Sequence, residues 1–238
     1  GYYNGLTLAG VGKETIVENI MVSYCKGNSF SILGGNLLLD KMVSYKSHIN
    51  DYKFNYGAQC EIINSLAIKS PYISGSGRSR CLVVSNHDDV EDTDFNNNQT
   101  LVESENLTLI NLSNDLEYDI KIGLVNEAIF VDEDSAFSTD KSVISGFNPA
   151  VILDENIKVN QENLARIRFT EMYFNNCNGN IFTEHDSNND DLENWYGNRA
   201  FFNVYSKGMD SQTFIDANNT RSPDYRLKIN KIVASNDD

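Results

Sequence analysis

A repeat of about 22 residues is the feature that most constrains the fold of this chain. The segment IMVSYCKGNSF, which begins at Ile20, returns as KMVSYKSHINDY from Lys41 and as EMYFNNCNGNIF from Glu171. Each copy has a short run with apolar residues at alternate positions, a bend rich in Gly, Asn, Asp and Ser, and a second short run. Short strands that return at this period predict a solenoid of stacked coils.

The register of the repeat is set by the need for equivalent apolar side chains to lie on the same face of each strand. The letters M-V-S-Y recur at an offset of 21 residues, from Met21 to Met42. An offset of 22 keeps the copies matched over a longer stretch, and it pairs Glu18 with Asp40, Ile20 with Met42, Phe30 with Tyr52, Ile32 with Phe54 and Gly35 with Gly57. A slip of one residue turns every side chain of a strand to the opposite face, so the sequence predicts the offset of 22.

Further copies extend the repeat along the chain. Ile20 aligns with Leu66, Leu107, Val143 and Met172, which stand at uneven spacings because loops are inserted between the copies. We expect rungs near 16–35, 36–57, 58–70, 101–112, 140–153 and 166–183, with inserted loops at 70–99 and 184–212. Leucine-rich repeats need a leucine ladder that this chain lacks, so the predicted fold is all-β, a single parallel β-helix domain over residues 1–238.

Charge and hydropathy exclude several classes of partner. The 34 acidic and 19 basic residues give a net charge of −15, which would repel nucleic acid and anionic membrane surfaces. No apolar run approaches the roughly 20 residues that a transmembrane helix needs. We therefore expect a protein that binds no nucleic acid and does not span a membrane.

The four cysteines, Cys25, Cys60, Cys81 and Cys177, form neither a C-x-x-C pair nor a zinc-finger pattern. An even number would permit disulfides in an exported protein, but the spacings match no framework, and we predict four free thiols. Cys25 and Cys177 occupy the same place in the repeat, five coils apart. At about 4.8 Å per coil they would lie about 24 Å from each other, too far for a disulfide.

Most of the chain resembles a known family, closely from Gly5 to Pro71 and more loosely after that. The stretch GLTLAGVG from Gly5 to Gly12 is similar to that family's G-L-T-L-G-G-V-G pattern, and Phe30, Gly34 and Gly35 match its G-D-D-x-F-E-x-F-G-G pattern. These are right-handed parallel β-helix proteins, pectin-lyase-like in fold, that Bacteroidetes-type bacteria export or anchor at the cell surface. The region around Trp195 resembles the family's C-terminal part.

The resemblance implies a right-handed helix, a secreted or outer-surface anchored bacterial protein, and a chain that corresponds to the C-terminal portion of a longer one. Missing N-terminal rungs or another chain would then cover the open edge of the first rung. Where the family has paired aspartates and a glutamate, this chain has Gly27, Asn28 and Ser31, and only Asp51 remains of the family's D-D-D-F-D-T-D run. Most carboxylates of a family-like cation or sugar site are therefore absent.

Two groups of residues are candidates for catalysis. A hydrolase of this fold needs acids on adjacent rungs, and the nearest approach in the sequence is His87-Asp88 at the start of an acidic run, which we interpret as a solvated loop. A lyase needs a base and a calcium site, and Arg166 and Arg168 alternate on what reads as a strand. A solvent-facing strand has the same pattern, so we predict that the chain has no catalytic residue. His87, Asp88, Arg166 and Arg168 remain the candidates for a mutational test.

Three oxygen-bearing residues, Asp186, Asn188 and Asp190, alternate as in the first half of a calcium loop. An EF-hand is excluded because Asp191 stands where glycine is required and Gly197 where the bidentate glutamate is required. We expect no cofactor, and an irregular structural calcium ion at these three residues remains open as the alternative.

Trp195 and Tyr196 are the candidate ligand residues, because aromatic rings stack on sugars, although in such folds they also seal the core or an end. Asp134-Ser135-Ala136 resembles a short bacterial O-glycosylation motif and so points to export. The sequence as a whole favours a non-catalytic β-helix protein that binds a glycan or another surface component. The alternatives are a polysaccharide lyase or glycoside hydrolase, and a structural spacer.

Overall fold

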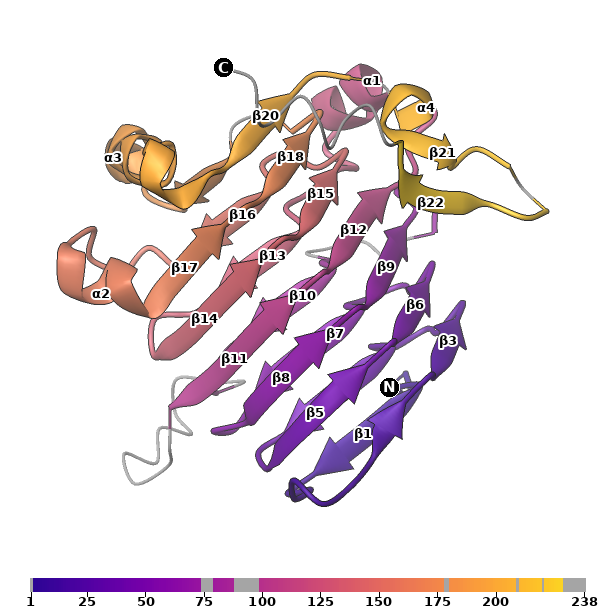
Figure 1. The fold of residues 1–238 in the computed structure, drawn as a ribbon, viewed down its shortest axis with the longest axis vertical. Coiled ribbons are helices and arrows are strands. Elements are labelled where there is room, and N and C mark those ends of the chain that lie inside the picture. The colour runs from indigo at the N-terminus through magenta and orange to yellow at the C-terminus, as the bar shows by residue number, and fades with distance from the viewer. Residues whose placement is uncertain are drawn as a thin grey trace.

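The computed structural model describes residues 2–73, 79–87, 99–177, 180–208, 210–219 and 221–228. The chain is a right-handed parallel β-helix in which three parallel sheets run along the length of the solenoid (Figure 1). We call them sheets A, B and C. Each full coil contributes one strand to sheet B, one to sheet C and one to sheet A, in that order along the chain.

The strands of each sheet stack in chain order along the solenoid. Sheet A contains β1 (Leu6–Ala9), β4 (Phe30–Leu33), β7 (Tyr52–Asn55), β10 (Leu82–Val84), β13 (Ile129–Val131), β16 (Val151–Leu153) and β19 (Ile181–Thr183). Sheet B contains β2 (Val17–Glu18), β5 (Asn36–Asp40), β8 (Gln59–Ile63), β11 (Thr100–Glu105), β14 (Ser135–Asp140) and β17 (Ile167–Thr170). Sheet C contains β3 (Met21–Ser23), β6 (Val43–Tyr45), β9 (Leu66–Lys69), β12 (Thr108–Asn111), β15 (Val143–Ser145), β18 (Tyr173–Asn175) and β20 (Val204–Ser206).

The remaining elements lie in the connections and near the C-terminus. They are the helices α1 (Leu116–Lys121), α2 (Gln161–Arg166), α3 (Asn189–Tyr196) and α4 (Asp210–Thr213), the 3₁₀ turns η2 (Asp186–Asn188) and η3 (Arg199–Phe201), and the antiparallel hairpin β21 (Phe214–Asp216) and β22 (Asp224–Leu227). The described residues contain no helix long and apolar enough to cross a membrane.

The offset of 22 residues between the first two coils is confirmed. Glu18 lies opposite Asp40, and Ile32 lies opposite Phe54. Stacking follows the same register, since the Phe30 and Tyr52 rings on adjacent coils are nearly parallel with centroids 5.2 Å apart.

The predicted alignment was wrong by one residue in two later copies. Leu66 and Val143 were aligned with Ile20, but Leu66 pairs with Val43 and Thr108, and Val143 pairs with Thr108. The position equivalent to Ile20 is therefore held by Ser65 and Ser142, which are both 2% exposed. The Ser65 hydroxyl accepts a hydrogen bond from Met42 N and donates to Ile63 O, so it fills an inward site without being apolar.

The predicted loop at 70–99 contains β10, which completes the third coil between β7 and β13. Helices α1 and α2 occupy the connections that follow β12 and β16. Helix α3 and η3 lie in the predicted loop at 184–212, which also holds β20. The extra length between copies is therefore partly ordered structure.

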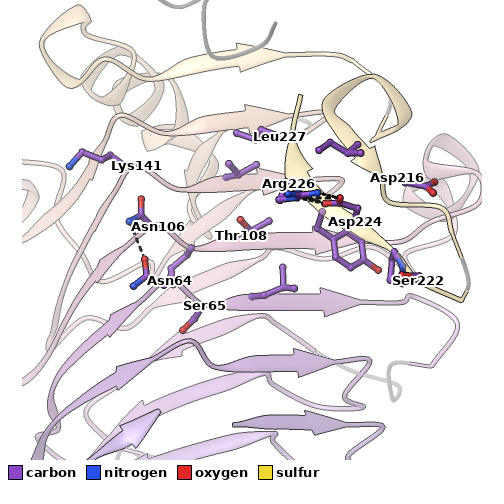
Figure 2. A pocket seen from close by; sticks show the side chains of 16 residues that line it. Asn64, Ser65, Asn106, Thr108, Lys141, Asp216, Ser222, Asp224, Arg226 and Leu227 are labelled. Carbon is purple, nitrogen blue, oxygen red and sulfur yellow. Dashed lines mark hydrogen bonds and ion pairs between the residues drawn. The ribbon is translucent and has the colours of Figure 1, made fainter. Parts of the chain in front are cut away.

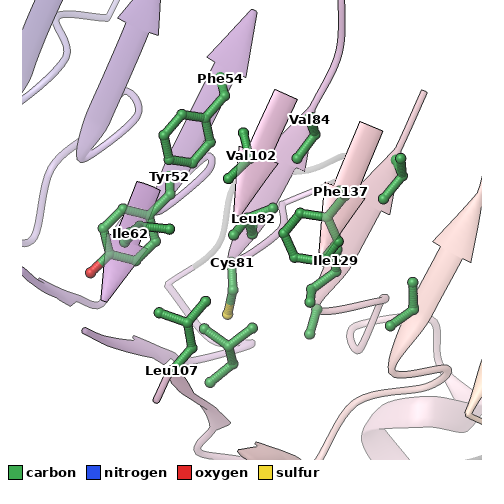
Figure 3. Packing of buried hydrophobic residues seen from close by; sticks show 14 of the residues in the cluster. Tyr52, Phe54, Ile62, Cys81, Leu82, Val84, Val102, Leu107, Ile129 and Phe137 are labelled. Carbon is green, nitrogen blue, oxygen red and sulfur yellow. The ribbon is translucent and has the colours of Figure 1, made fainter. Parts of the chain in front are cut away.

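The core is a continuous column of inward side chains from all three sheets (Figure 3). Tyr52 and Leu82 enter from sheet A, Ile62 and Phe137 from sheet B, and Leu107 from the turn that leads into sheet C. Cys81 is buried among them, and no disulfide joins any of the four cysteines in the described structure. Because each layer packs on the next, the solenoid forms a rigid scaffold for its outer surface.

The turn from sheet B to sheet C has the same backbone in every complete coil. One residue there has a positive φ, near 50°, and the six are Asn19, Lys41, Asn64, Asn106, Lys141 and Glu171. The left-handed conformation favours Asn among residues that carry a Cβ. The stacked turns therefore form a ridge of outward polar side chains along the solenoid.

The C-terminal hairpin packs on the outer face of sheet C, beside β9 and β12 (Figure 1). Phe214 of β21 is fully buried and clusters there with Ile68 and Ile110. These apolar residues point away from the solenoid core, and the hairpin removes them from water.

Candidate functional site

A groove of about 820 Å³ lies between the C-terminal hairpin and the ridge of B-to-C turns (Figure 2). Its volume lies within the range of ordinary ligand sites. The turns contribute Asn64, Ser65, Asn106, Leu107 and Lys141, the outer face of sheet C contributes Leu66, Thr108 and Val143, and the hairpin region contributes Ile215, Asp216, Ser222, Pro223, Asp224, Tyr225, Arg226 and Leu227. We call this the hairpin groove.

Side-chain amides from neighbouring coils form one wall of the hairpin groove. Asn106 Nδ2 donates to Asn64 Oδ1 at 3.2 Å, and Asn64 Nδ2 donates to Asp40 Oδ1 at 2.9 Å. Both asparagines occupy the left-handed turn position, which fixes the direction of their side chains. The wall is therefore held in place before any ligand arrives.

The charged groups of the hairpin groove are paired with one another or with neighbours. Arg226 Nε and Nη2 bind the Asp224 carboxylate at 2.9 and 2.5 Å, and this arginine lowers the pKa of Asp224 to about 2. Lys141 Nζ lies 2.9 Å from Glu105 and 3.5 Å from Asp140, and hydrogen bonding to Glu105 raises the pKa of the lysine. The groove consequently presents little net charge to a ligand.

The floor and far wall supply apolar contacts and hydroxyls. Leu66 and Val143 lie on the sheet, Leu227 lies on the hairpin, and the hydroxyls of Thr108 and Tyr225 stand among them. Amides, hydroxyls and apolar patches together can hydrogen-bond and pack against a polyhydroxylated ligand.

Tyr196 is 1% exposed and seals the C-terminal end of the core. Its hydroxyl donates to Ile167 O at 2.8 Å, and its ring packs edge-on against Phe169. A ligand cannot stack on this ring in the folded protein. Trp195 is only partly buried and lines a separate cleft between α2 and α3.

Asp186 and Asp190 are exposed, in η2 and at the start of α3, and Asn188 is partly buried. Among the described residues, no group of three His, Cys, Asp or Glu side chains is arranged to hold a metal ion. A calcium ion at these positions stays a prediction.

Arg166 and Arg168 do not alternate on a strand, which corrects the sequence interpretation. Arg166 is the last residue of α2, where its Nη2 donates to Asn163 Oδ1, and β17 begins one residue later. Arg168 is exposed on β17, opposite Ser138.

His87 has an acidic neighbour one coil away that the sequence did not reveal. His87 follows β10 and Asp132 follows β13 at the same corner of the solenoid, and the two interact electrostatically. Burial raises the pKa of Asp132, and Asp154 and Asp134 raise it further. Asp88, the other member of the candidate pair, lies outside the described residues.

Glu61 and Glu103 form a second feature that sequence reasoning missed. They lie directly opposite each other on β8 and β11, face outward, and line a shallow hollow of about 360 Å³ together with Lys13 and Gln59. Adjacent parallel strands are about 4.8 Å apart, close to the 5 to 5.5 Å between the carboxyl groups of retaining glycosidases. Because the 70–99 segment separates the two strands, only the register brings these acids together.

Two residues singled out from the sequence are buried. Asp51 is 0% exposed, accepts hydrogen bonds from Ser44 and Ser47, and lies 3.6 Å from the buried Lys69 amine. It is therefore an interior structural group. Ser135 is 1% exposed, so the folded chain does not present this hydroxyl for glycosylation.

Comparison with known proteins adds one family match. The sequence model described as a pectate-lyase-like beta helix domain matches residues 2–223. No curated protein and no solved structure matches the chain.

Proposed function

The chain belongs to the family of pectate-lyase-like β-helix domains, and we propose that it is a non-catalytic member that binds a glycan in the hairpin groove. The observation that carries this proposal is the groove itself: a preformed hollow of about 820 Å³ in which stacked amides and hydroxyls surround apolar patches. Sugars present the same combination of hydroxyls and apolar C–H surface. The β-helix supplies the rigid support that such a site needs.

The pairing of charges favours a neutral glycan over an acidic one. Both cations of the groove already contact carboxylates, Arg226 with Asp224 and Lys141 with Glu105. A uronate would have to compete for these cations against a chain of net charge −15. Neutral hydroxyl groups meet no such penalty.

A glycan array with groove variants tests the proposal. Thr108→Tyr places a bulky ring in the groove from an outward position on β12, and we expect it to weaken binding of neutral glycans roughly tenfold or more, which is about 1.4 kcal/mol or more. Thr7→Tyr is the matched control, because Thr7 is exposed on β1 in sheet A. Equal binding by the wild type and Thr108→Tyr, or binding of uronates alone, would contradict the proposed site.

A glycoside hydrolase is the second candidate function, and the facing Glu61 and Glu103 favour it. If this hollow is catalytic, the protein releases new reducing ends from a polysaccharide, and Glu61→Gln and Glu103→Gln each abolish the release. Glycan binding that persists in both variants without any product would leave the hairpin groove as the functional site.

The proposal includes a setting outside the cytoplasm, secreted or anchored at an outer bacterial surface, where a glycan or a surface protein is the partner. The support is the resemblance of the chain, closest from Gly5 to Pro71, to exported β-helix proteins. Labelling of intact cells with an antibody to this domain tests it. The same binding assay repeated in EDTA tests the calcium alternative, because a site at Asp186, Asn188 and Asp190 that matters for binding would make the affinity fall.

A further inference from the structure

A second cleft, of about 520 Å³, lies between α2 and α3 and shares no lining residue with the hairpin groove. Its apolar wall includes Leu164, Trp195 and Phe201, and the rings of Trp195 and Phe201 lie 6.2 Å apart with a tilt of 44°. The polar side chains that line it are Asn160, Gln161, Asp191, Asn194 and Asn198. We call this the Trp195 cleft.

The walls of the Trp195 cleft are fixed to the solenoid. Leu164 anchors α2 in the core, and Leu192 and Tyr196 anchor α3. The Glu193 carboxylate of α3 accepts hydrogen bonds from Asn180 N and Ile181 N at the edge of sheet A. A ligand would therefore meet a preformed site and would spend little free energy on ordering it.

The side chain of Trp195 is only partly buried, so part of its indole ring is accessible at the wall of the cleft. Its Nε1 is itself covered by protein and has no hydrogen-bond partner within the described part of the chain. A ligand in the cleft would therefore contact the indole ring, and its hydrogen bonds would go to the polar side chains around that ring.

We propose that the Trp195 cleft is a second binding site that takes one neutral pyranose ring of a glycan. The aromatic face would pack on the C–H surface of the sugar. The four amides both donate and accept hydrogen bonds, as sugar hydroxyls do, and Asp191 adds an acceptor. A cationic amine could use Trp195 and Asp191, but it would turn its charge toward the amide N–H donors. The proposal shares its ligand class with the hairpin groove and none of its residues.

The chain has a single tryptophan, so its intrinsic fluorescence reports on this cleft directly. The probes are neutral hexasaccharides of glucose, xylose, mannose and galactose, with choline as the cationic comparison. We expect a saturable change of tryptophan emission with at least one hexasaccharide and none with choline. Asn194→Ala should weaken that response roughly tenfold, and Asn156→Ala, which alters an exposed asparagine outside the cleft, should leave it unchanged.

Thr108→Tyr separates the two sites. The emission response should persist in this variant, because its filled groove lies elsewhere. Array binding without any emission change would overturn the Trp195 cleft and leave the groove standing. An emission change together with array binding that Thr108→Tyr does not weaken would overturn the hairpin groove and support the Trp195 cleft. A response to choline alone, or one unaltered in Asn194→Ala, would also overturn the proposed sugar site.

Discussion

At the scale of single residues, buried hydroxyls complete a core that sequence patterns treat as apolar. Ser65 and Ser142 occupy the inward position that Ile20, Met42 and Leu107 fill in other coils. Each hydroxyl accepts a hydrogen bond from a backbone N–H of the preceding coil: Ser65 from Met42 N, and Ser142 from Leu107 N. The polar side chain is satisfied, so its burial is tolerated.

Ser65→Ala should destabilise the fold. The change leaves Met42 N and Ile63 O without this partner, and we expect the free energy of unfolding to fall by about 1 to 2 kcal/mol in urea titrations. Ser23→Ala is the control, because Ser23 is exposed on β3. A loss no greater than that of the control would show that the Ser65 hydroxyl does not hold the turn.

The same hydroxyls explain where the register could be read from the sequence and where it could not. Between the first two coils, large apolar residues mark the inward face, so the offset of 22 was recoverable. In the coils that contain Ser65 and Ser142, the apolar pattern assigned the inward position to the next residue, Leu66 or Val143. The acceptor role of a serine depends on a backbone N–H more than twenty residues away, which no local pattern contains.

The raised pKa of Asp132 predicts that the stability of the fold depends on pH. Burial raises the pKa of Asp132 above its ordinary value of 3.8, so the folded chain holds this proton more tightly than the unfolded chain. The stabilisation is present below pH 3.8 and is lost as the pH rises through the raised pKa. Asp132→Asn should therefore become more stable relative to the wild type between about pH 4 and about pH 7.

Urea unfolding of both proteins at the two pH values measures this trend, with the exposed Glu14→Gln as the control. A difference between Asp132→Asn and the wild type that stays constant, or that shrinks as the pH rises, would contradict it.

At the scale of elements, the strands of the solenoid show the sequence repeat, and the short helices lie in the connections between them. Helices α1, α2 and α3 have six to eight residues, and each buries only one or two side chains. So short a segment has no recognisable helical period, which is why no helix was expected there. The hairpin groove was missed for a related reason, since it forms where β21 and β22 pack on sheet C, about 100 residues from Asn106 in sequence.

Helix α3 should be essential to the C-terminal end of the solenoid. Glu193→Ala removes the acceptor of Asn180 N, Asn180 Nδ2 and Ile181 N, and we expect a loss of about 1 to 3 kcal/mol in the free energy of unfolding. Asp190→Ala on the same helix is exposed and should cost less than about 1 kcal/mol. Equal effects of the two substitutions would show that the Glu193 contacts do not stabilise this end.

At the scale of the whole molecule, the parallel β-helix packs its stabilising core inside the solenoid and has its candidate binding sites on the outer surface. The core is filled by inward residues, and the groove, the cleft and the facing glutamates all lie outside it. The solenoid class was predicted from the repeat because stacking imposes one pattern on every coil. The sites depend on insertions and on the hairpin, so each had to be located in the structure.

The proposed function requires that this chain binds a neutral glycan without cleaving it. Calorimetric titration of the wild-type protein with the best ligand from the array, followed by assays of the same sample for new reducing ends and for unsaturated products, tests it most directly. We expect saturable binding that Thr108→Tyr weakens roughly tenfold or more at the hairpin groove, with no product after prolonged incubation. Product that disappears in Glu61→Gln or Glu103→Gln would contradict non-catalytic binding and identify the chain as an enzyme.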